Sequence, residues 1–528
     1  MSNIFLGLDL GTSGCKLIAF DSSGRELARA ARTYPVINSG PGLLELDADI
    51  VWLQAEACFR EICARALPGH VKTLAVSVLG EAVLPVDRAG NALALSVISA
   101  DMRCMAEVEE LSQRFGADRI YAITGQPLAP IYSLPKLMWW KKNRTDLIDK
   151  ACKFVCFGEF VLMRLGLPPI IDEGMAARML AFDIERKAWS QELLDMASLT
   201  PRHLPGVAPS GTILGVIAPD IAIRLALPDG VRVVLGGHDQ PMGALGAGAV
   251  ERGTAVYSLG TTEALVVQLP GASVALRAHN IPCYPHVIPD LRVGLAGNQS
   301  GGRVLTWYRE AMSLAGESGA SVASLDELLA SLEDEEPAWP ILLPHFLGSG
   351  SVLNDHDSLG ALFGLRFDTK RSHILLSLLE GITFEQAMSL EALSRAAGPI
   401  RTLRVIGGGA RSTLWLQMKA DILNRPLMQI AVPDASCLGG AILGRWALDR
   451  LRSMGEIADA MVTTGQTFHP RADRHLAHAE RLEIYRTLYK ALQPLSRSLR
   501  AQWSRAPSSV GGKETTAFSA KPSGRQRP

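Results

Sequence analysis

Asp9-Leu10-Gly11-Thr12-Ser13, near the start of the chain, has a counterpart in Ser258-Leu259-Gly260-Thr261-Thr262 near the middle. Each stretch follows a short apolar run typical of a strand, residues 4–8 in the first case and 254–257 in the second. A turn of glycine and hydroxyl residues at the end of a strand presents backbone N–H and small O–H donors together, as phosphate oxygens require. The repeat predicts a nucleotide held between two related domains, and the acidic Asp9 indicates which half meets a metal ion.

The size and composition of the chain favour a globular protein of two large domains. At 528 residues the chain exceeds what one core usually holds, and its 48% hydrophobic residues suffice for two cores. The 53 basic residues equal the 53 acidic ones, so no net charge points to nucleic acid or a membrane surface. No apolar stretch is long enough to span a bilayer, and the first residues lack the basic start of a signal peptide. The eight cysteines form neither a CxxC pair nor a zinc-like cluster, so we expect reduced thiols in a cytoplasmic protein.

The hydrophobic spacing alternates between the periods of strands and helices, which is typical of an α/β fold. The predicted strands include residues 4–9, 16–21, 73–79, 231–235 and 403–406. The predicted helices include residues 49–66, 148–165, 372–393, 415–423 and 480–499. We expect one domain over residues 1–247, a second over 248–500, and a disordered basic tail over 501–528, where little can be buried.

Further motifs follow the repeated loop in a fixed order: GGHDQ at 236–240, GGGARSTLWLQMKAD at 407–421 and DASCLGGA at 434–441. Together these stretches resemble the FGGY family of carbohydrate kinases over nearly the whole chain, and its xylulokinase-like members in particular. The resemblance implies two actin-like ATPase domains of ribonuclease-H-like topology around a central cleft. It also implies phosphorylation of a sugar hydroxyl, with ATP as donor and Mg²⁺ as the metal ion.

Asp239 is the predicted general base. It follows a buried strand in a glycine-rich turn, and phosphoryl transfer to a sugar requires a group that accepts the proton of the attacking hydroxyl. The residue types alone support equally well an aspartate that caps the following helix. The resemblance favours catalysis, because the matching aspartate is the base in that family.

The first half supplies the predicted metal ligand and the first phosphate contacts. Asp9 ends a strand beside the glycine turn, where a carboxylate can hold Mg²⁺, although an aspartate there can also merely shape the loop. Lys16 equally suits a phosphate contact and a solvated strand position. The predicted phosphate-facing residues of this half are Gly11, Thr12, Ser13 and Lys16.

The second half supplies the remaining nucleotide contacts. A lone Gly-Thr-Thr triplet is more often an ordinary hairpin turn, and three successive glycines often mark only a flexible turn. The resemblance assigns the first to phosphate and the second to adenine and ribose. The predicted residues are Gly260, Thr261, Thr262, Gly408, Gly409 and Ala410.

A polyhydroxy substrate requires convergent polar groups, and the predicted sugar contacts are Glu81, Asp101, Arg103, His238, Gln240 and Asn298. Glu81 stands where many xylulokinase-like members have Met-His, which leaves the sugar open among xylulose, other pentuloses, hexuloses and polyols. Asp101 and Arg103 are also compatible with a surface ion pair, and Asn298 with a helix cap. His238 suits either a substrate contact or a group that fixes the turn beside Asp239.

The sequence thus predicts a cytoplasmic, ATP-dependent kinase of a small sugar, with domain closure excluding water. Homodimers are frequent in the resembling family, and we expect neither nucleic acid nor a membrane as partner. One alternative is an actin- or Hsp70-like ATPase, which shares the phosphate loops but has no reason to keep GGHDQ. The other is a sugar sensor without turnover, against which the intact Asp9 and Asp239 argue.

Overall fold

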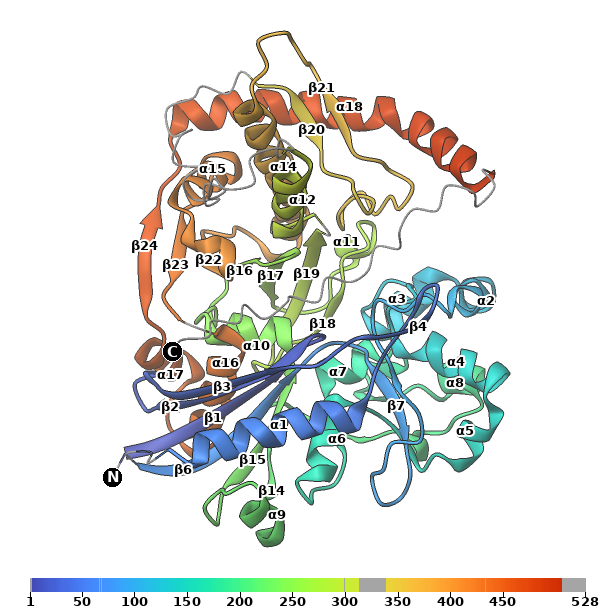
Figure 1. Ribbon diagram of the computed structural model, residues 1–528, viewed down its shortest axis with the longest axis vertical. Helices are drawn as coiled ribbons and strands as arrows, with labels where there is room; N and C mark the ends of the chain where they lie inside the picture. The colour runs from blue at the N-terminus through green and yellow to red at the C-terminus, as the bar shows by residue number, and fades with distance from the viewer. Residues whose placement is uncertain are drawn as a thin grey trace, which may run out of the picture.

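The computed structural model describes residues 2–505 apart from 66, 68, 299, 313–338 and 433. Two large mixed sheets, one from each half of the chain, form its framework (Figure 1). The strands of the first sheet lie in the order β14 (Ile213–Val216), β15 (Arg232–His238), β6 (Gly69–Val78), β1 (Ser2–Leu10), β2 (Gly14–Asp21) and β3 (Glu26–Thr33). Those of the second lie in the order β18 (Cys283–Pro285), β19 (Arg292–Asn298), β17 (Glu263–Leu269), β16 (Thr254–Leu259), β22 (Thr402–Ile406), β23 (Leu427–Ile430) and β24 (Thr464–Phe468).

The two sheets share one topology. In the first, β3, β2 and β1 form an antiparallel meander to which β6 and β15 add in parallel. In the second, β19, β17 and β16 form the meander, and β22 and β23 add in parallel. The predicted α/β class, with two related halves, is confirmed.

One predicted helix is wrong, because part of it forms a strand of a third, smaller sheet in the first half. Residues 148–165 divide into the end of α5 (Thr145–Lys150), strand β9 (Lys153–Cys156) and helix α6 (Phe157–Arg164). The strand β9 pairs with β7 (Val83–Val86), and a capping box between Cys156 and Glu159 starts α6 afresh. The apolar periodicity did not reveal strand β9, because the apolar residues 154–156 fit a buried strand as well as a helix.

The predicted helices elsewhere form close to their expected positions. Helix α1 (Ala48–Cys63) is capped by Asp47, which accepts hydrogen bonds from the amides of residues 49 and 50, and its apolar face packs on β2 and β3. Helices α14 (Arg371–Ala397), α15 (Thr413–Leu423) and α18 (Ala472–Arg505) cover the second half. Because α18 runs to Arg505, residues 501–505 of the predicted tail are helical, and residues 506–528 lie outside the described residues.

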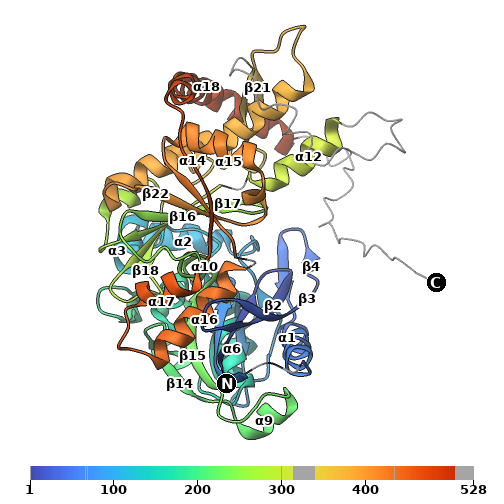
Figure 2. The ribbon, with the colours of Figure 1, turned by 90° about the vertical axis from the view of Figure 1, so that its left-hand side faces the viewer.

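Helix α16 (Ala435–Leu448) belongs to the second half by sequence but packs on β1 and β6 of the first sheet, and beside α10 (Asp239–Gly246). Figure 2 shows α10, α16 and α17 (Met454–Met461) side by side. A Cβ on Gly7 would lie 1.9 Å from the carbonyl oxygen of Cys437, so only glycine lets α16 approach β1 this closely. The start of α16 therefore lies against the strand that ends in the first predicted phosphate loop.

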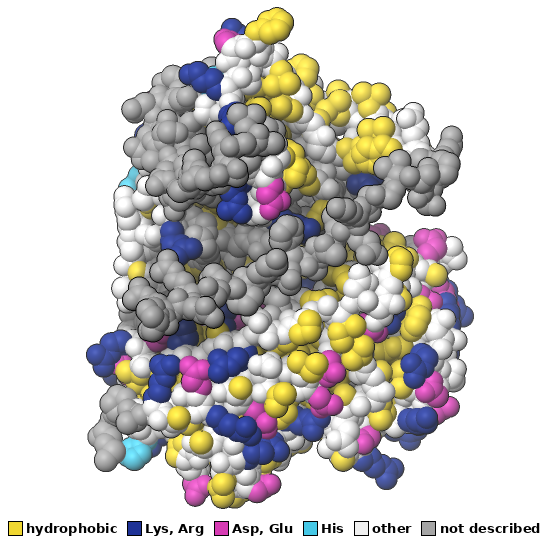
Figure 3. Space-filling model, viewed as in Figure 1, with side chains coloured by type: hydrophobic (Ala, Val, Ile, Leu, Met, Phe, Trp, Pro, Cys, Tyr) yellow, Lys and Arg dark blue, Asp and Glu magenta, His cyan; other side chains and the backbone are white. Residues whose placement is uncertain are grey.

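On the face drawn in Figure 3, basic and acidic side chains are interspersed, in keeping with the equal numbers of the two. No helix among the described residues is both long and apolar enough to cross a membrane. The division of the chain at residue 247 stays a prediction.

Candidate active site

Asp239 lies at the junction between β15 and α10, where the strand ends at His238 and the helix begins at the next residue. Its side chain is 32% exposed, and the N-cap position of α10 is taken by His238, whose side chain makes no capping hydrogen bond. Desolvation raises the pKa of Asp239 to about 6, although Arg178 and hydrogen bonding from Gln240 oppose this rise. A carboxyl group of that pKa at a helix N-terminus is suited to accept a proton near neutral pH.

Asp9 lies on β1, paired with Ser77 of β6 on one side and with Lys16 of β2 on the other. Ser77 Oγ donates a hydrogen bond of 2.7 Å to Asp9 Oδ1. Desolvation, followed by repulsion from Asp434 and Asp239, raises the pKa of Asp9 to about 7. Three carboxyl groups therefore gather here, a surplus of negative charge that a divalent cation would relieve.

Asp434 was not among the predicted site residues, although it opens the DASCLGGA motif. It caps α16, accepting from the amide of Cys437 at 3.1 Å, and forms an ion pair with Lys16 Nζ at 2.7 Å. Among the described residues, no group of three or more His, Cys, Asp or Glu side chains is arranged to hold a metal ion by itself. This arrangement fits Mg²⁺, which usually takes one or two carboxylates and completes its shell with water and phosphate oxygens.

The first predicted phosphate loop is a tight turn between β1 and β2. The amide of Gly11 donates to the carbonyl of Gly14 at 2.9 Å, and Tyr34 Oη donates to the carbonyls of both glycines at 2.7 and 3.0 Å. Thr12 and Ser13 remain exposed at the tip. Tyr34 thus fixes the backbone of the turn, while the hydroxyl side chains of Thr12 and Ser13 are exposed.

The second predicted phosphate loop joins β16 and β17. Its residues Gly260, Thr261 and Thr262 are exposed, and two of its carbonyls accept from the amides of Gly302 and Arg303 at 2.9 and 3.2 Å. Those amides lie at the start of α12 (Gly302–Met312). The loop is thereby fixed to the N-terminus of a helix.

The glycine run 407–409 reaches the same edge of the second sheet, because β22 lies parallel beside β16 with Ile406 opposite Ser258. Gly408 is exposed and Gly409 is half-buried, whereas Ala410 is buried and its carbonyl accepts from Gln429 Nε2 at 2.7 Å. The structure therefore brings the predicted phosphate and adenine residues of the second half to one sheet edge.

Glu81 adopts a left-handed backbone conformation, with φ of +59°, which is uncommon for a residue other than glycine. Its backbone carbonyl accepts from Ser133 Oγ at 3.1 Å, and its carboxylate accepts from Ser99 Oγ at 2.8 Å. The carboxylate also forms an ion pair with Arg178. The residue is 2% exposed, so buried contacts hold this left-handed turn.

Arg178, at the end of α7 (Glu173–Arg178), is a candidate site residue that the sequence reasoning missed. It is 6% exposed, and its guanidinium carbon lies 5.3 Å from the ring centre of Tyr284. Its Nε and Nη1 atoms are buried without a hydrogen-bond partner among the described residues. Buried donors without partners are costly and typical of places where a ligand supplies the acceptors.

His238 is almost fully buried, with 4% exposure. Its Nδ1 lies 2.9 Å from Tyr284 Oη, and its Nε2 lies 3.1 Å from Asp239 Oδ1. Desolvation, followed by the charge of Arg178, places the pKa of His238 well below its usual value, so the ring is neutral. Of its two predicted roles, these contacts favour the group that fixes the surroundings of Asp239.

Asp101 and Arg103 form a buried ion pair, so the surface-pair alternative is wrong. They are 0% and 6% exposed at the side chain, and the guanidinium makes two parallel bonds of 2.8 and 2.7 Å to the carboxylate. Arg103 also contacts Glu45 at 2.9 Å, and Asp101 accepts from the amide of Leu44 at 2.7 Å. The pair thus fastens its own loop to strand β5 (Leu43–Leu46).

Asn298 lies on β19 of the second sheet, away from the other predicted sugar residues in the fold. It is 3% exposed, accepts from the amide of Ser300 at 2.9 Å, and donates to the carbonyl of Ile382 at 3.5 Å. None of these bonds joins it to the network of Glu81, Arg178 and His238. The amide of Ser300 lies before the start of α12, so these contacts show neither the predicted sugar contact nor the predicted helix cap.

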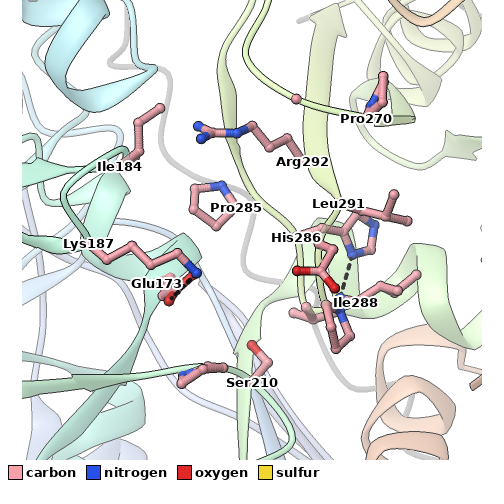
Figure 4. A pocket seen from close by; sticks show the side chains of 15 residues that line it. Glu173, Ile184, Lys187, Ser210, Pro270, Pro285, His286, Ile288, Leu291 and Arg292 are labelled. Atoms are coloured by element: carbon pink, nitrogen blue, oxygen red, sulfur yellow. Dashed lines mark hydrogen bonds and ion pairs between the residues drawn. The ribbon is translucent and has the colours of Figure 1, made fainter.

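A cavity of about 350 Å³ is lined by residues of both halves, among them Pro285 of β18 (Figure 4). Its lining contains none of the predicted site residues. Lys187 pairs with Glu173 at 3.1 Å, and His286 Nδ1 accepts from the amide of Ile288 at 3.0 Å, both of which Figure 4 marks. Arg292, also in the lining, pairs with Glu185 outside it, at 2.8 Å.

Models of the N- and C-terminal domains of the FGGY family of carbohydrate kinases match residues 4–246 and 255–448. The chain belongs to this family. FGGY kinases are sugar kinases that use ATP as phosphate donor, so the alternative of an actin- or Hsp70-like ATPase falls away.

The relatives of this FGGY kinase carry different substrate names. It is 25% identical over 511 residues to a gluconokinase from Bacillus subtilis, covering 95% of this chain and 97% of the relative. It is 27% identical over 499 residues to an autoinducer-2 kinase from Klebsiella pneumoniae, covering 92% and 93%. A solved xylulose kinase from Rhodospirillum rubrum superposes with a TM-score of 0.84 at 24% identity, covering 93% and 99%, and has the predicted fold of two actin-like domains.

The residues that the sequence reasoning missed in this FGGY kinase are Ser77, Asp434, Arg178 and Tyr284. Asp434 carried a signal, since it begins a motif that was already noted. The other three stand in no motif that we recognised, and only the folded chain brings them to Asp9, Glu81 and His238.

Proposed function

We propose that this FGGY kinase transfers the γ-phosphoryl group of ATP to a hydroxyl of a small neutral sugar or polyol, a ketose such as xylulose or a related pentulose or hexulose. The observation that carries the proposal is the position of Asp239, a carboxyl group of raised pKa, beside the buried network of Glu81 and Arg178. Two nitrogens of Arg178 lack acceptors, which hydroxyl oxygens of a substrate would provide.

The charges around Asp239 favour a neutral substrate over a sugar acid. Glu81 already neutralises the charge of Arg178. Desolvation and, after it, repulsion from Asp434 and Asp239 raise the pKa of Asp9, so a further carboxylate nearby would be opposed. Hydroxyl groups are uncharged, so this repulsion does not oppose them, and they can both donate and accept hydrogen bonds.

In the proposed reaction, Asp239 accepts the proton of the attacking hydroxyl as the bond to the γ-phosphorus forms. The exposed hydroxyls of Thr12, Ser13, Thr261 and Thr262 hold phosphate oxygens from the two halves. Asp9 would hold Mg²⁺, which neutralises charge on the phosphates when bound. Arg178 and Glu81 orient the sugar by donating to and accepting from its hydroxyls.

We further propose that the enzyme works in the cytoplasm and as a homodimer. All eight cysteines are free thiols, and five of them are buried beside apolar residues of the cores, which suits a reducing compartment. The proposal of a homodimer rests only on the frequency of homodimers in the FGGY family. Sedimentation velocity at micromolar concentration tests the oligomeric state directly.

A coupled assay of ADP release, over a panel of pentuloses, hexuloses, polyols and aldonates, tests the function. We expect a neutral ketose or polyol to stimulate release, and Asp239→Asn to lower kcat by about 10²- to 10⁴-fold. Asp229→Asn, an exposed aspartate ten residues earlier, is the matched control and should leave kcat unchanged.

Three outcomes would count against separate parts of this proposal. If folded protein releases no ADP in response to any sugar in the panel, the kinase assignment falls. If Asp239→Asn retains full turnover, only the assignment of the base falls. Selective turnover of the aldonates would overturn the neutral substrate class.

A further inference from the structure

Glu81 stands at the centre of a three-residue turn between β6 and β7. The amide of Ala82 donates a hydrogen bond of 2.8 Å to the carbonyl of Gly80, across Glu81, whose φ is +59°. A γ-turn around a residue of positive φ is the rarer of the two kinds, because it strains the backbone. Such backbone persists only where its surroundings hold it, so contacts with other elements must fix this turn.

The first turn of helix α4 (Ser133–Asn143) supplies such contacts. Ser133 Oγ donates to the carbonyl of Glu81 at 3.1 Å, and Lys136 Nζ donates to the same oxygen at 3.4 Å. Lys136 Nζ also donates to the carbonyl of Ile131 at 2.6 Å, which fixes its amine beside the turn. Because Ser133 and Lys136 are three residues apart, they lie on one face of the helix and reach one acceptor together.

Lys136 is a costly group to bury. It is 0% exposed, and desolvation lowers its pKa to about 8. A lysine is almost never fully buried unless its amine has partners, because removing that amine from water is unfavourable. Its acceptors here are backbone carbonyls, and an amine can donate to both of them whether it is protonated or neutral. A side chain without the amine would leave the carbonyl of Glu81 with Ser133 alone.

The start of α4 also contacts the residues around Arg178, the ion-pair partner of Glu81. The amide of Leu134 donates to the carbonyl of Met179 at 3.0 Å, and Met179 directly follows Arg178 at the end of α7. The guanidinium carbon of Arg178 lies 5.8 Å from the ring centre of Tyr132, the residue before the helix. The start of α4 is therefore in contact with the surroundings of both members of the ion pair.

We propose that Ser133 and Lys136 are positioning residues for the sugar, which hold the backbone of Glu81 so that its carboxylate and Arg178 keep the orientation that the substrate requires. This inference rests on the proposed function of the Glu81–Arg178 pair. It deepens that function, because recognition of the sugar then depends on two side chains that do not touch it. Both residues are 0% exposed, so they act through the turn.

Ser133→Ala removes one donor and leaves a good helix former in its place. We expect the sugar KM to rise roughly 3- to 10-fold, as for one lost hydrogen bond, with kcat and the ATP KM within about 2-fold of wild type. Ser377→Ala is the matched control, because Ser377 is also 0% exposed and donates to a backbone carbonyl, that of Ile374 at 2.8 Å. The control should leave the sugar KM unchanged.

Lys136→Met keeps the apolar stem of the side chain and loses the amine. We expect the sugar KM to rise roughly 10- to 100-fold, as for a lost hydrogen-bond donor that carries charge. Lys141→Met, on the same helix, is the matched control, since Lys141 donates at 3.4 Å to the carbonyl of Met196, which is no part of the turn. A wild-type sugar KM in folded Ser133→Ala, or an ATP KM that rises as much as the sugar KM, would overturn the positioning role.

A measurement without substrate keeps this inference separate from the proposed function. Hydrogen exchange of residues 80–84, followed by mass spectrometry, reports how often the bond between the Ala82 amide and the Gly80 carbonyl opens. We expect exchange there to be roughly 3- to 30-fold faster in Ser133→Ala and Lys136→Met, and unchanged in the two controls. Wild-type exchange in Ser133→Ala would overturn the inference. If not even the wild-type protein turns over a sugar, the proposed function fails, and faster exchange still supports the hold of α4 on the turn.

Discussion

At the scale of single residues, the candidate site is marked by carboxyl groups whose surroundings oppose their charge. Desolvation raises the pKa of Asp239 to about 6 and that of Asp9 to about 7. Such shifts are costly, and they concentrate at sites where a ligand or a proton is to be received. Glu81 is buried as well, but it is paired with Arg178 and held by Ser99.

The pKa of Asp239 predicts an acid limb in the rate. A base accepts a proton only when it is ionised, so activity must fall as the pH drops through its folded-state value. We expect kcat/KM for the sugar, at saturating Mg-ATP, to halve near pH 6 rather than near 3.8, the ordinary value for aspartate. A rate that stays level down to pH 5, in protein shown by circular dichroism to remain folded, would contradict this.

At the scale of elements, buried ion pairs in the second half tie one helix to the sheet and another helix to its neighbour. Lys419 of α15 lies 2.9 Å from Glu263 of β17, and both are 0% exposed at the side chain. Tyr257 of β16 donates to the same carboxylate. Glu380 of α14 binds His478 and Arg481 of α18. The first network fixes α15 against the sheet whose edge holds Gly260–Thr262, and the second fixes α18 to α14.

Removing one member of the Lys419–Glu263 pair should be severely destabilising, since it leaves an uncompensated buried charge. We expect Lys419→Met to cost about 3–5 kcal/mol of stability, measured by urea unfolding. The double variant Lys419→Met/Glu263→Gln should recover part of this cost. Arg119→Gln, which breaks the exposed pair with Glu192, is the control and should cost less than about 1 kcal/mol. A loss no larger for Lys419→Met than for the control would show that the buried pair is dispensable.

At the scale of the whole molecule, the two halves are joined by helices α10 and α16, which lie against one another. One begins with Asp239 and the other is capped by Asp434, so their packing sets the position of both carboxyl groups. A Cβ on Gly246 would lie 1.7 Å from the carbonyl oxygen of Ala435, which leaves no room for a side chain. The distance between the helices therefore depends on glycine.

Gly246→Ala should push α10 and α16 apart. We expect a loss of at least about 1–3 kcal/mol in urea unfolding, together with a lower kcat, because overpacking must displace backbone. Gly271→Ala is the matched control, since a Cβ there would meet nothing within 4 Å. If both variants unfold at the same urea concentration and turn over equally, the packing of α10 on α16 does not determine the positions of Asp239 and Asp434.

Much of the fold and part of the site followed from local patterns in the sequence. The strands that end in Asp9 and Ser258, the helix from 371 to 397 and the glycine run 407–409 carry their own signals of apolar period and turn residues. The order of motifs pointed to the family, which the domain matches confirm. The helix predicted over 148–165 failed because pairing with β7 turned residues 153–156 into a strand.

The sequence by itself determined the two related halves, their glycine turns after β1 and β16 and the place of Asp239 between a strand and a helix, because each of these depends on neighbours in the chain. Only the tertiary structure decided that Asp101 and Arg103 are buried, that Arg178 faces Glu81, and that Tyr284 reaches His238 from the other half. These contacts join residues on separate elements, most of them far apart in the chain. No local periodicity or turn chemistry records such pairs, since they arise only when the elements pack and bury one another's polar groups.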